Sequence, residues 1–357
     1  MKDAKHILVI NPGSTSTKLA LFRQQDAVWQ ENLEHIPEEL KPFDRVWQQL
    51  EFRLQLIEAH LSQRQLDYAE LAAVVGRGGL LKPMEGGTYL VNQQMLKDAR
   101  AGLQGEHGAN LGCALAYDIA QKAGVSAYVV DPISVDEFEP LARYSGHPLI
   151  ERRCLSHALN IHAVTRKAAE MLEVEYSVSN FIVAHLGGGI SVAPVRGGKI
   201  VDVNDASSAG PFSPERTGGL PLQPFIKLCF SGKYSENEMR RLVMGNGGLR
   251  AYLGTTSKKE VEDRIQHGDH MAAEVYQAMI YQIAKEIGAM ATVLHGNVRA
   301  IVLTGGLAKS QIVTQWIKER VGFIAEVVIL PGEFEMEAMN LGVLRVLEGK
   351  ETAKIYG

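Results

Sequence analysis

Two segments of the chain, about half its length apart, repeat one pattern of a strand, a glycine-rich polar turn and a second strand. Residues 7–22 surround the turn Asn-Pro-Gly-Ser-Thr-Ser-Thr-Lys (residues 11–18, the first loop), and residues 181–195 surround His-Leu-Gly-Gly-Gly (residues 185–189, the second loop). β-Branched runs that end at glycines predict strands joined by turns. Two copies of one unit predict a duplicated fold, whereas a chance pair of unrelated hairpins is the alternative.

Further strand-like runs alternate with helical segments along the chain. Residues 72–87 and 299–310 begin with β-branched runs and end at glycines, while residues 155–173 and 270–294 carry apolar side chains at helical spacing. Alternation of this kind is typical of α/β proteins. The apolar helix expected around residues 275–294 suits either the core or an interface between subunits.

The length of the chain favours two domains. Its 357 residues exceed the size at which a single hydrophobic core usually stops growing. We expect an N-terminal domain at residues 1–147 and a C-terminal domain, with nucleotide-binding loops, at residues 148–336. The last segment, at about residues 337–357, is expected to pack back on the first domain.

Composition and charge exclude several classes of protein. Apolar residues make up 46% of the chain and charged residues 22%, as is ordinary for a globular protein, and the net charge of −4 comes without a basic block. We therefore expect no nucleic acid and no membrane among its partners. Three widely spaced cysteines, and a first segment with too few apolar residues for a signal peptide, predict a cytoplasmic protein.

The first loop combines residue types that suit a phosphate. Successive backbone N–H groups at a glycine turn form an anion-binding nest, to which the hydroxyls of Ser14 and Ser16 and the charge of Lys18 are added. The side-chain carbonyl of Asn11 suits a hard cation such as Mg²⁺. These residues fit a nucleotide-phosphate site and a plain hairpin turn about equally well. Because the chain has neither a Walker A loop nor a G-x-G-x-x-G motif, a nucleotide needs several glycine turns together.

Six motifs follow one another in a fixed order along nearly the whole chain. They are V-I-N-P-G-S-T-S-T-K at residues 9–18, G-R-G-G-L-L-K-P-M-E-G-G-T-Y at 76–89, H-L-G-G-G-I-S-V at 185–192, G-P-F-S-P-E-R-T-G-G-L-P at 210–221, L-T-G-G-L-A at 303–308 and P-G-E-F-E-M-E-A at 331–338. In this order they resemble the acetate kinase family of acyl-phosphate-forming enzymes, and within it the butyrate kinases. The resemblance implies the α/β fold of the sugar kinase, actin and heat-shock chaperone superfamily, with duplicated ribonuclease-H-like (actin-like ATPase) domains and an active-site cleft between them.

The resemblance also implies roles for particular residues. Asp131, Arg216 and His157 match catalytic residues, and Arg77 matches the arginine that holds the substrate carboxylate. Asn11 and Glu335 match residues that hold Mg²⁺, although an alignment slip of one or two residues would favour Glu333 or Glu337 over Glu335. The residues expected to bind ATP or ADP are Asn11, Ser14, Ser16, Lys18, His185, Gly187, Gly188, Gly189, Gly305 and Gly306.

Most departures from the acetate kinase pattern lie at positions expected to bind the acid substrate. Acetate kinases carry bulky apolar side chains after the substrate arginine and before the catalytic histidine, where this chain has Gly79 and Ser156. Both residues are expected to bind the substrate and to enlarge its acyl pocket, so that butyrate or a short branched-chain fatty acid fits. Gly188 also replaces an asparagine of the second loop.

The sequence therefore predicts an ATP-dependent carboxylate kinase that forms an acyl phosphate and ADP reversibly, as a homo-oligomer of two or more subunits. An acetate or propionate kinase is one alternative. Another is a nucleotide-driven clamp like the actins and chaperones, without a small-molecule acceptor. Arg77 and Arg216 favour the kinase, because a clamp needs phosphate loops but no arginine for a carboxylate.

Overall fold

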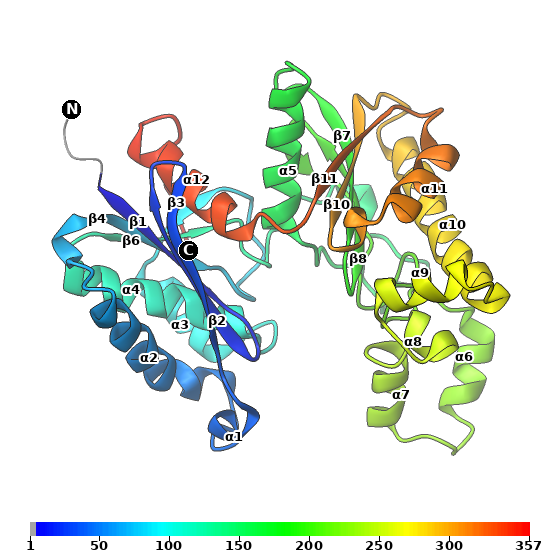
Figure 1. Cartoon of the computed structure of the whole chain (residues 1–357), viewed down its shortest axis with the longest axis horizontal. Coiled ribbons are helices and arrows are strands. Elements are labelled where there is room, and N and C mark those ends of the chain that lie inside the picture. The colour runs from blue at the N-terminus through cyan, green and yellow to red at the C-terminus, as the bar shows by residue number, and fades with distance from the viewer. Residues whose placement is uncertain (1–4) are drawn as a thin grey trace. The chain divides into compact units, whose positions relative to one another are not determined.

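The structure is a computed structural model that describes residues 5–357, and it divides the chain into two compact units (Figure 1). Unit 1 comprises the residues through Asp136 together with Phe334–Gly357, and unit 2 comprises Glu137–Glu333. The last part of the chain therefore returns to the unit in which the chain begins.

Unit 1 is built on a seven-stranded sheet with the strand order β12-β5-β6-β4-β1-β2-β3. β1, β2 and β3 form an antiparallel meander, β4 lies parallel to β1, and β6 lies parallel to β4. Residues 7–10 of β1 are all buried, as expected for a strand covered on both faces. The strands are β1 (His6–Pro12), β2 (Ser16–Arg23), β3 (Asp26–Glu34), β4 (Leu71–Arg77), β5 (Thr88–Leu90), β6 (Ser126–Val130) and β12 (Lys354–Ile355).

Helices cover this sheet. α4 packs on β1, β4 and β6, and α12 packs against the same three strands. Figure 1 shows α2, α3 and α4 on one side of the sheet and α12 on the other. The helices of unit 1 are α1 (Pro37–Leu40), α2 (Leu50–Gln63), α3 (Gln93–Ala101), α4 (Gly112–Ala123) and α12 (Glu335–Leu347), with 3-10 turns η1 (Val46–Gln49), η2 (Tyr68–Glu70) and η3 (Gly108–Leu111).

Unit 2 repeats the central topology of unit 1. Its sheet has the order β11-β10-β7-β8-β9, in which β7, β8 and β9 form an antiparallel meander while β10 and β11 continue in parallel with β7. The segment β6-β4-β1-β2-β3 of unit 1 has this same order and these same strand directions. The predicted duplicated α/β fold is confirmed, and the chance pair of hairpins is excluded. The strands are β7 (Asn180–Leu186), β8 (Ile190–Arg196), β9 (Lys199–Ile200), β10 (Ala300–Gly305) and β11 (Glu326–Pro331).

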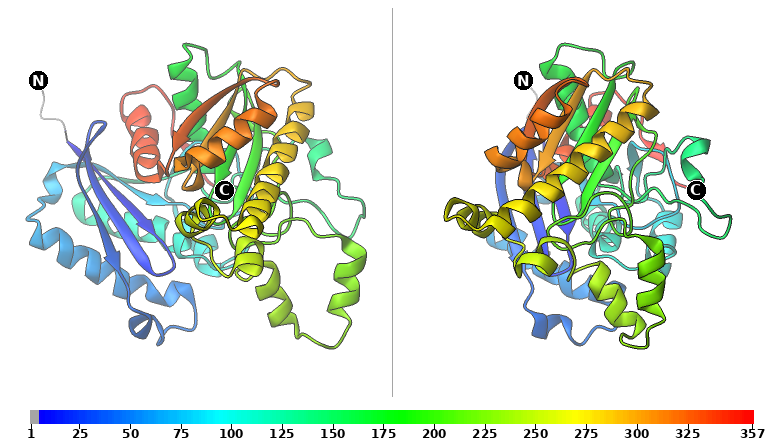
Figure 2. Two further views of the ribbon diagram at one scale, coloured as in Figure 1. Left: turned by 45° about the vertical axis from the view of Figure 1, so that its right-hand side comes forward. Right: turned by 90° about the vertical axis from the view of Figure 1, so that its right-hand side faces the viewer.

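The longest helix of unit 2, α10, belongs to the core. It packs against α11 and β8, and Figure 2 shows α10 and α11 side by side in both views. Tyr276, Met279 and Ile283 on this helix are fully buried. The helices of unit 2 are α5 (Ala158–Met171), α6 (Leu222–Cys229), α7 (Glu236–Val243), α8 (Gly248–Leu253), α9 (Lys258–Gln266), α10 (His270–Val293) and α11 (Gln311–Val321), with 3-10 turns η4 (Pro140–Arg143) and η5 (Leu307–Lys309).

The first unit ends earlier in the chain than the domain expected at residues 1–147. Glu137 and Glu139 are hydrogen-bonded to the segment after β8. The Glu137 carboxylate accepts from the Ile200 N–H at 2.8 Å, and the Glu139 N–H donates to the Val201 carbonyl at 3.0 Å. These bonds assign the segment after Asp136 to the second sheet. The division into functional domains stays a prediction.

Across residues 5–357, the structure has no helix with the length and apolar character that a membrane crossing requires.

Candidate active site

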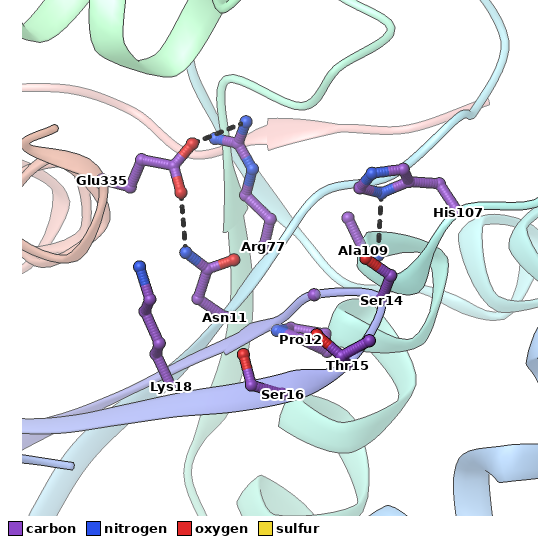
Figure 3. Close-up of a pocket in the computed structure, with 11 residues that line it drawn as sticks. Asn11, Pro12, Ser14, Thr15, Ser16, Lys18, Arg77, His107, Ala109 and Glu335 are labelled. Carbon is purple, nitrogen blue, oxygen red and sulfur yellow. Dashed lines mark hydrogen bonds and ion pairs between the residues drawn. The ribbon is translucent and has the colours of Figure 1, made fainter. Parts of the chain in front are cut away.

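A polar pocket with a volume of about 250 Å³ lies in unit 1, where the first loop, the end of β4 and the start of α12 meet (Figure 3). Figure 3 shows the side chains of Asn11 and Lys18 extending from the β1–β2 hairpin towards Glu335. Asn11 and Lys18 are neighbours because they are paired residues in the antiparallel register of β1 and β2. The pocket is lined by Asn11, Pro12, Gly13, Ser14, Thr15, Ser16, Lys18, Arg77, His107, Ala109 and Glu335.

Glu335, the first residue of α12, connects two of the predicted site residues. Its Oε2 accepts a hydrogen bond from Asn11 Nδ2 at 2.7 Å, and its Oε1 lies 3.2 Å from Arg77 Nη2. Glu337 instead contacts the exposed Gln30, and Glu333 belongs to unit 2. The contact with Asn11 supports Glu335 among the three candidates, and its role at a metal stays a prediction.

Arg77 is the last residue of β4, and one of its guanidinium nitrogens is an unused hydrogen-bond donor. The residue is 6% exposed, and its buried Nη1 has no hydrogen-bond partner among residues 5–357. The backbone of β4 lies directly against α4, because a Cβ at Gly112 would lie 2.2 Å from the Arg77 carbonyl oxygen and a Cβ at Gly76 would lie 1.9 Å from the Gly112 carbonyl oxygen. The two glycines allow this contact, and the buried cation beside it suits an anionic ligand.

His107 is a pocket residue that the sequence did not reveal. Its Nδ1 accepts a hydrogen bond from the Ala109 N–H at 3.1 Å, so the proton of the neutral ring is on Nε2. Burial lowers the pKa of His107, the charge of Arg77 lowers it further, and Glu335 acts in the opposite direction. The ring is therefore neutral at pH 7 and is a hydrogen-bond donor through Nε2. A single histidine between Glu106 and Gly108 carries no pattern from which this position could be inferred.

Asp131 follows β6 in a left-handed backbone conformation, with φ of 39°. Its carboxylate accepts from the Gly87 N–H at 2.6 Å, and its own N–H donates to the Gly87 carbonyl at 3.0 Å. Since Val130 pairs with Arg77 across β4 and β6, Asp131 comes directly after the residue that pairs with the arginine. Within residues 5–357, four other non-glycine residues with positive φ lie in turns, at Gln24, Gln65, Glu173 and His295, so the conformation alone does not mark a functional site. The catalytic role of Asp131 stays a prediction. Asp131 does not line the pocket of Figure 3.

In unit 2, two predicted histidines stack on each other. The rings of His157 and His185 have centroids 3.9 Å apart and an angle of 12° between their planes. His157 Nδ1 lies 3.0 Å from Ser191 Oγ, and His185 Nδ1 lies 2.9 Å from Asn160 Nδ2. These contacts fix both rings at the ends of β7 and α5. Ser191 and Asn160 were not predicted as site residues.

Three further predicted site residues, Arg216, Gly305 and Gly306, also belong to unit 2. A Cβ at Gly189 would lie 2.5 Å from Arg216 Nη1, so the guanidinium lies against this glycine. Gly305 has φ of 88°, and a Cβ there would lie 2.5 Å from the Leu186 carbonyl oxygen. Gly306 follows it, and its carbonyl accepts from Lys258 Nζ at 2.8 Å. Unit 2 thus brings together His157, the second loop, Arg216 and Gly305, whose binding roles stay predictions.

Gly79 and Ser156 were expected to enlarge the acyl pocket. A Cβ at Gly79 would lie 2.2 Å from Asn110 Oδ1 and 2.6 Å from Asn110 Cα, so the space beside this glycine is filled. The argument from Gly79 to a larger pocket is therefore wrong, and a contact of Gly79 with the acid stays a prediction. Ser156, in unit 2, has a buried hydroxyl without a hydrogen-bond partner in the described part of the chain. The size argument now rests on this residue.

The duplicated topology and the glycine loops at matching strand ends define a protein with the actin-like ATPase fold. A crystal structure of acetate kinase from Porphyromonas gingivalis has this fold, with a TM-score of 0.80 and 18% identity over 97% of this chain and 100% of that one. The acetokinase family model matches residues 142–326. The chain belongs to the acetokinase family, and it is an ATP-dependent carboxylate kinase.

Relatives of known sequence match almost the whole chain. A probable butyrate kinase of Listeria innocua is 50% identical over 351 residues, which cover 98% of this chain and 99% of the relative. Butyrate kinase 2 of Clostridium acetobutylicum is 49% identical over the same shares of the two chains.

Proposed function

We propose that the enzyme transfers the γ-phosphoryl group of ATP reversibly to butyrate or a short branched-chain fatty acid, which gives an acyl phosphate and ADP. The butyrate kinase relatives support this acid. The observation that carries the proposal is Arg77, a buried guanidinium in a polar pocket with one Nη on Glu335 and the other without a partner. A guanidinium can hold a carboxylate through two parallel hydrogen bonds.

The acid brings its own nucleophile. The pKa of a fatty acid carboxyl is close to that of a glutamate side chain, ~4.3, so the carboxylate is ionised at neutral pH and needs no general base. The remaining barrier is the electrostatic repulsion between the carboxylate and the polyanionic phosphates. The enzyme therefore lowers it mainly by positioning the reactants and neutralising their charge. Arg77 positions the carboxylate, and Lys18 with the first loop binds phosphate oxygens. Arg216 and His157 of unit 2 are proposed to stabilise charge on the transferred group.

Magnesium is the proposed metal. The residues 5–357 contain no group of three or more His, Cys, Asp or Glu side chains placed to hold a metal ion. Mg²⁺ in kinases commonly takes one or two carboxylates together with substrate phosphates and water, so a pocket with the Glu335 carboxylate and the Asn11 amide fits it. When bound, Mg²⁺ supplies neutralisation of phosphate charge. Glu335 and Asn11 would hold it, and Asp131 is proposed to orient it.

The test is a hydroxamate assay for acyl phosphate, run with ATP and a series of acids from acetate to valerate, including isobutyrate. We expect kcat/KM to be highest for a four-carbon or branched acid. Differences between neighbouring acids are expected to be modest, because one methylene in an apolar pocket is worth ~1–3 kcal/mol. A clear preference for acetate or propionate would overturn the choice of acid and leave the carboxylate kinase. Acyl phosphate with none of these acids would overturn the proposed class of short-chain fatty acid substrates.

We also propose that the enzyme is a cytoplasmic homo-oligomer, a dimer or larger. Support for an oligomer comes from α6, which buries none of its residues. The apolar side chains at its two ends are also exposed, Leu222 by 72% and Phe230 by 87%, as is typical of an interface. Sedimentation velocity of the wild type and of Phe230→Ser tests this point. A monomeric wild type at micromolar concentration would contradict it.

A further inference from the structure

Arg53, in the first turn of α2, is 1% exposed and is bound to the backbone of the first loop. Its Nη1 donates to the carbonyls of Gly13 at 2.8 Å and Ser16 at 3.1 Å, and to Thr17 Oγ1 at 3.2 Å. Its Nη2 donates to the Ser14 carbonyl at 3.1 Å. The guanidinium therefore ties three carbonyls of the loop to the core of unit 1.

The remaining carbonyl of the turn also has a hydrogen-bond donor, whereas two N–H groups of the turn have no acceptor in the described chain. The Thr15 carbonyl accepts from the His35 N–H at 2.9 Å, and the Ser16 carbonyl also accepts from the Gly13 N–H at 2.8 Å. All four carbonyls of residues 13–16 are thus bound within the protein. The N–H groups of Ser14 and Thr15 have no acceptor within residues 5–357, and both residues are exposed and line the pocket. Backbone donors without acceptors, in residues that line a pocket, can form a site for an anion.

The charge of Arg53 is not balanced by a carboxylate in the described chain. The other acceptor of the guanidinium is the neutral Gln49, whose Oε1 lies 3.1 Å from Nε and 2.8 Å from Nη2. The first turn of a helix also disfavours a cation, because the helix dipole is positive there. Burial lowers the pKa of Arg53 to about 10, so the group remains charged at neutral pH. Arg77, by contrast, has Glu335.

We propose that Arg53 is a positioning residue for the phosphates of the nucleotide. It holds the carbonyls of Gly13, Ser14 and Ser16 inward, so that the Ser14 and Thr15 N–H groups are left for phosphate oxygens. Its unbalanced charge attracts the phosphates from beneath the loop. This inference rests on the proposed phosphate site at the first loop. It adds a residue that makes no contact with the nucleotide.

The decisive variant is Gln49→Glu, which places a carboxylate of the same shape on the guanidinium. It keeps the hydrogen bonds of Arg53 but neutralises its charge, and a buried ion pair in place of a lone cation should not weaken folding. We expect the Kd for ADP, measured by calorimetry, to rise at least about fivefold, since a unit charge acts over several ångströms inside a protein. The KM for the acid should stay within about twofold of the wild type. ADP binding that is unchanged or tighter would overturn the inference.

Two variants of Arg53 itself separate its charge from its geometry. Arg53→Met removes both, and we expect the KM for ATP to rise by about tenfold or more while the KM for the acid changes little. Arg53→Lys keeps the charge but loses the planar fork, so its ADP affinity should lie between those of the wild type and Arg53→Met. Should Arg53→Met fail to fold, Gln49→Glu decides alone. Equal losses for ATP and for the acid would show a merely structural residue and contradict the proposal.

Gln55→Glu is the matched control for added charge, because Gln55 is an exposed residue of the same helix whose side chain contacts Glu51. It should leave ADP binding unchanged. Lys18→Ala separates the failure of this inference from that of the proposed phosphate site. If Lys18→Ala weakens ADP binding and Gln49→Glu does not, the role of Arg53 is wrong and the site stands. If neither variant weakens it, the site itself is wrong.

Discussion

Arg77 and Arg53 are buried arginines of unit 1 whose guanidinium groups differ in their ion-pair and hydrogen-bond partners. Arg77 shares its guanidinium with Glu335 at 3.2 Å and keeps Nη1 without a partner, while Arg53 uses its donors on carbonyls, a hydroxyl and an amide. A buried cation with an unused donor is costly unless a ligand completes it. This difference fits the proposed role of Arg77 in binding a ligand that carries its own charge, whereas Arg53 is bound to the loop.

Arg77→Lys tests the carboxylate contact at the scale of one residue. Lysine keeps the charge but cannot offer two parallel N–H groups, so we expect the KM for the acid to rise by about tenfold or more, in line with ~1.5–3 kcal/mol for a charge-assisted hydrogen bond. The KM for ATP should change much less. Steady-state kinetics with butyrate measure both constants. Arg45→Lys, at an exposed arginine that pairs with Glu106, serves as the control, and an unaltered acid KM in Arg77→Lys would contradict the assignment.

His35 makes the stability of the first loop depend on pH. Its Nε2 lies 2.9 Å from Thr17 Oγ1, burial lowers its pKa below the ordinary 6.5, and the charge of Arg53 lowers it further, against Glu39. Since the unfolded chain then takes up a proton more readily than the folded chain, stability falls as the pH drops below 6.5 towards the folded pKa. More than about one pH unit above 6.5 both states are neutral at this residue, so it adds no pH dependence there.

Urea unfolding at pH 7.5 and pH 5.5 measures this effect. We expect His35→Gln, whose amide can still reach Thr17, to lose less stability between the two pH values than the wild type does. His147→Gln, at an exposed histidine, should lose as much as the wild type. Equal losses in all three proteins would show that His35 does not carry the pH dependence.

At the scale of elements, the contact between β4 and α4 sets the position of Arg77. The backbone at Gly76 and Gly112 approaches too closely for a side chain on either residue. Gly112→Ala should therefore push α4 from β4, which costs ~1–3 kcal/mol as overpacking does, and should raise the KM for the acid because Arg77 moves with its carbonyl. Unfolding curves and acid kinetics measure the two effects.

Gly288→Ala is the control for this glycine substitution. Gly288 lies within α10, and a Cβ there would meet nothing within 4 Å. Alanine in an open helical position stabilises by up to ~1 kcal/mol, so this variant should be as stable as the wild type or more so. If Gly112→Ala behaves in the same way, the tight contact does not position Arg77.

Local patterns in the sequence predicted the elements and loops, and long-range packing determined the rest. The hairpins around the first and second loops follow from glycines between β-branched runs, which act over a few residues. Arg53 could not be assigned, because its partners lie about 40 residues earlier in the chain and an arginine in a helix normally faces solvent. Gly79 was misread for the same reason, since Asn110 fills the space beside it.

At the scale of the whole molecule, unit 1 is closed by the last residues of the chain. β12 adds to the sheet beside β5, and Tyr356 is 5% exposed, with its hydroxyl donating to Asp98 Oδ2 at 2.9 Å. The Lys354 side chain donates to the Gly86 carbonyl at 2.7 Å. Gly87, the next residue, binds the carboxylate and the N–H of Asp131. The end of the chain therefore supports the segment that holds the proposed catalytic aspartate.

Deletion of residues 354–357 should affect both stability and catalysis through this chain of contacts. The loss of a buried aromatic side chain alone costs about 3–5 kcal/mol, so the unfolding midpoint should fall clearly. Because the Gly87 backbone loses its support, we expect kcat to fall more than the KM for ATP or for the acid rises. Tyr356→Phe keeps the ring but removes the bond to Asp98 and the acceptor of the Lys82 N–H, and it should lose about 1–3 kcal/mol of stability with kcat close to the wild type. A deletion that lowers stability but leaves kcat unchanged at a temperature where the protein is folded would mean that Asp131 is held without the end of the chain.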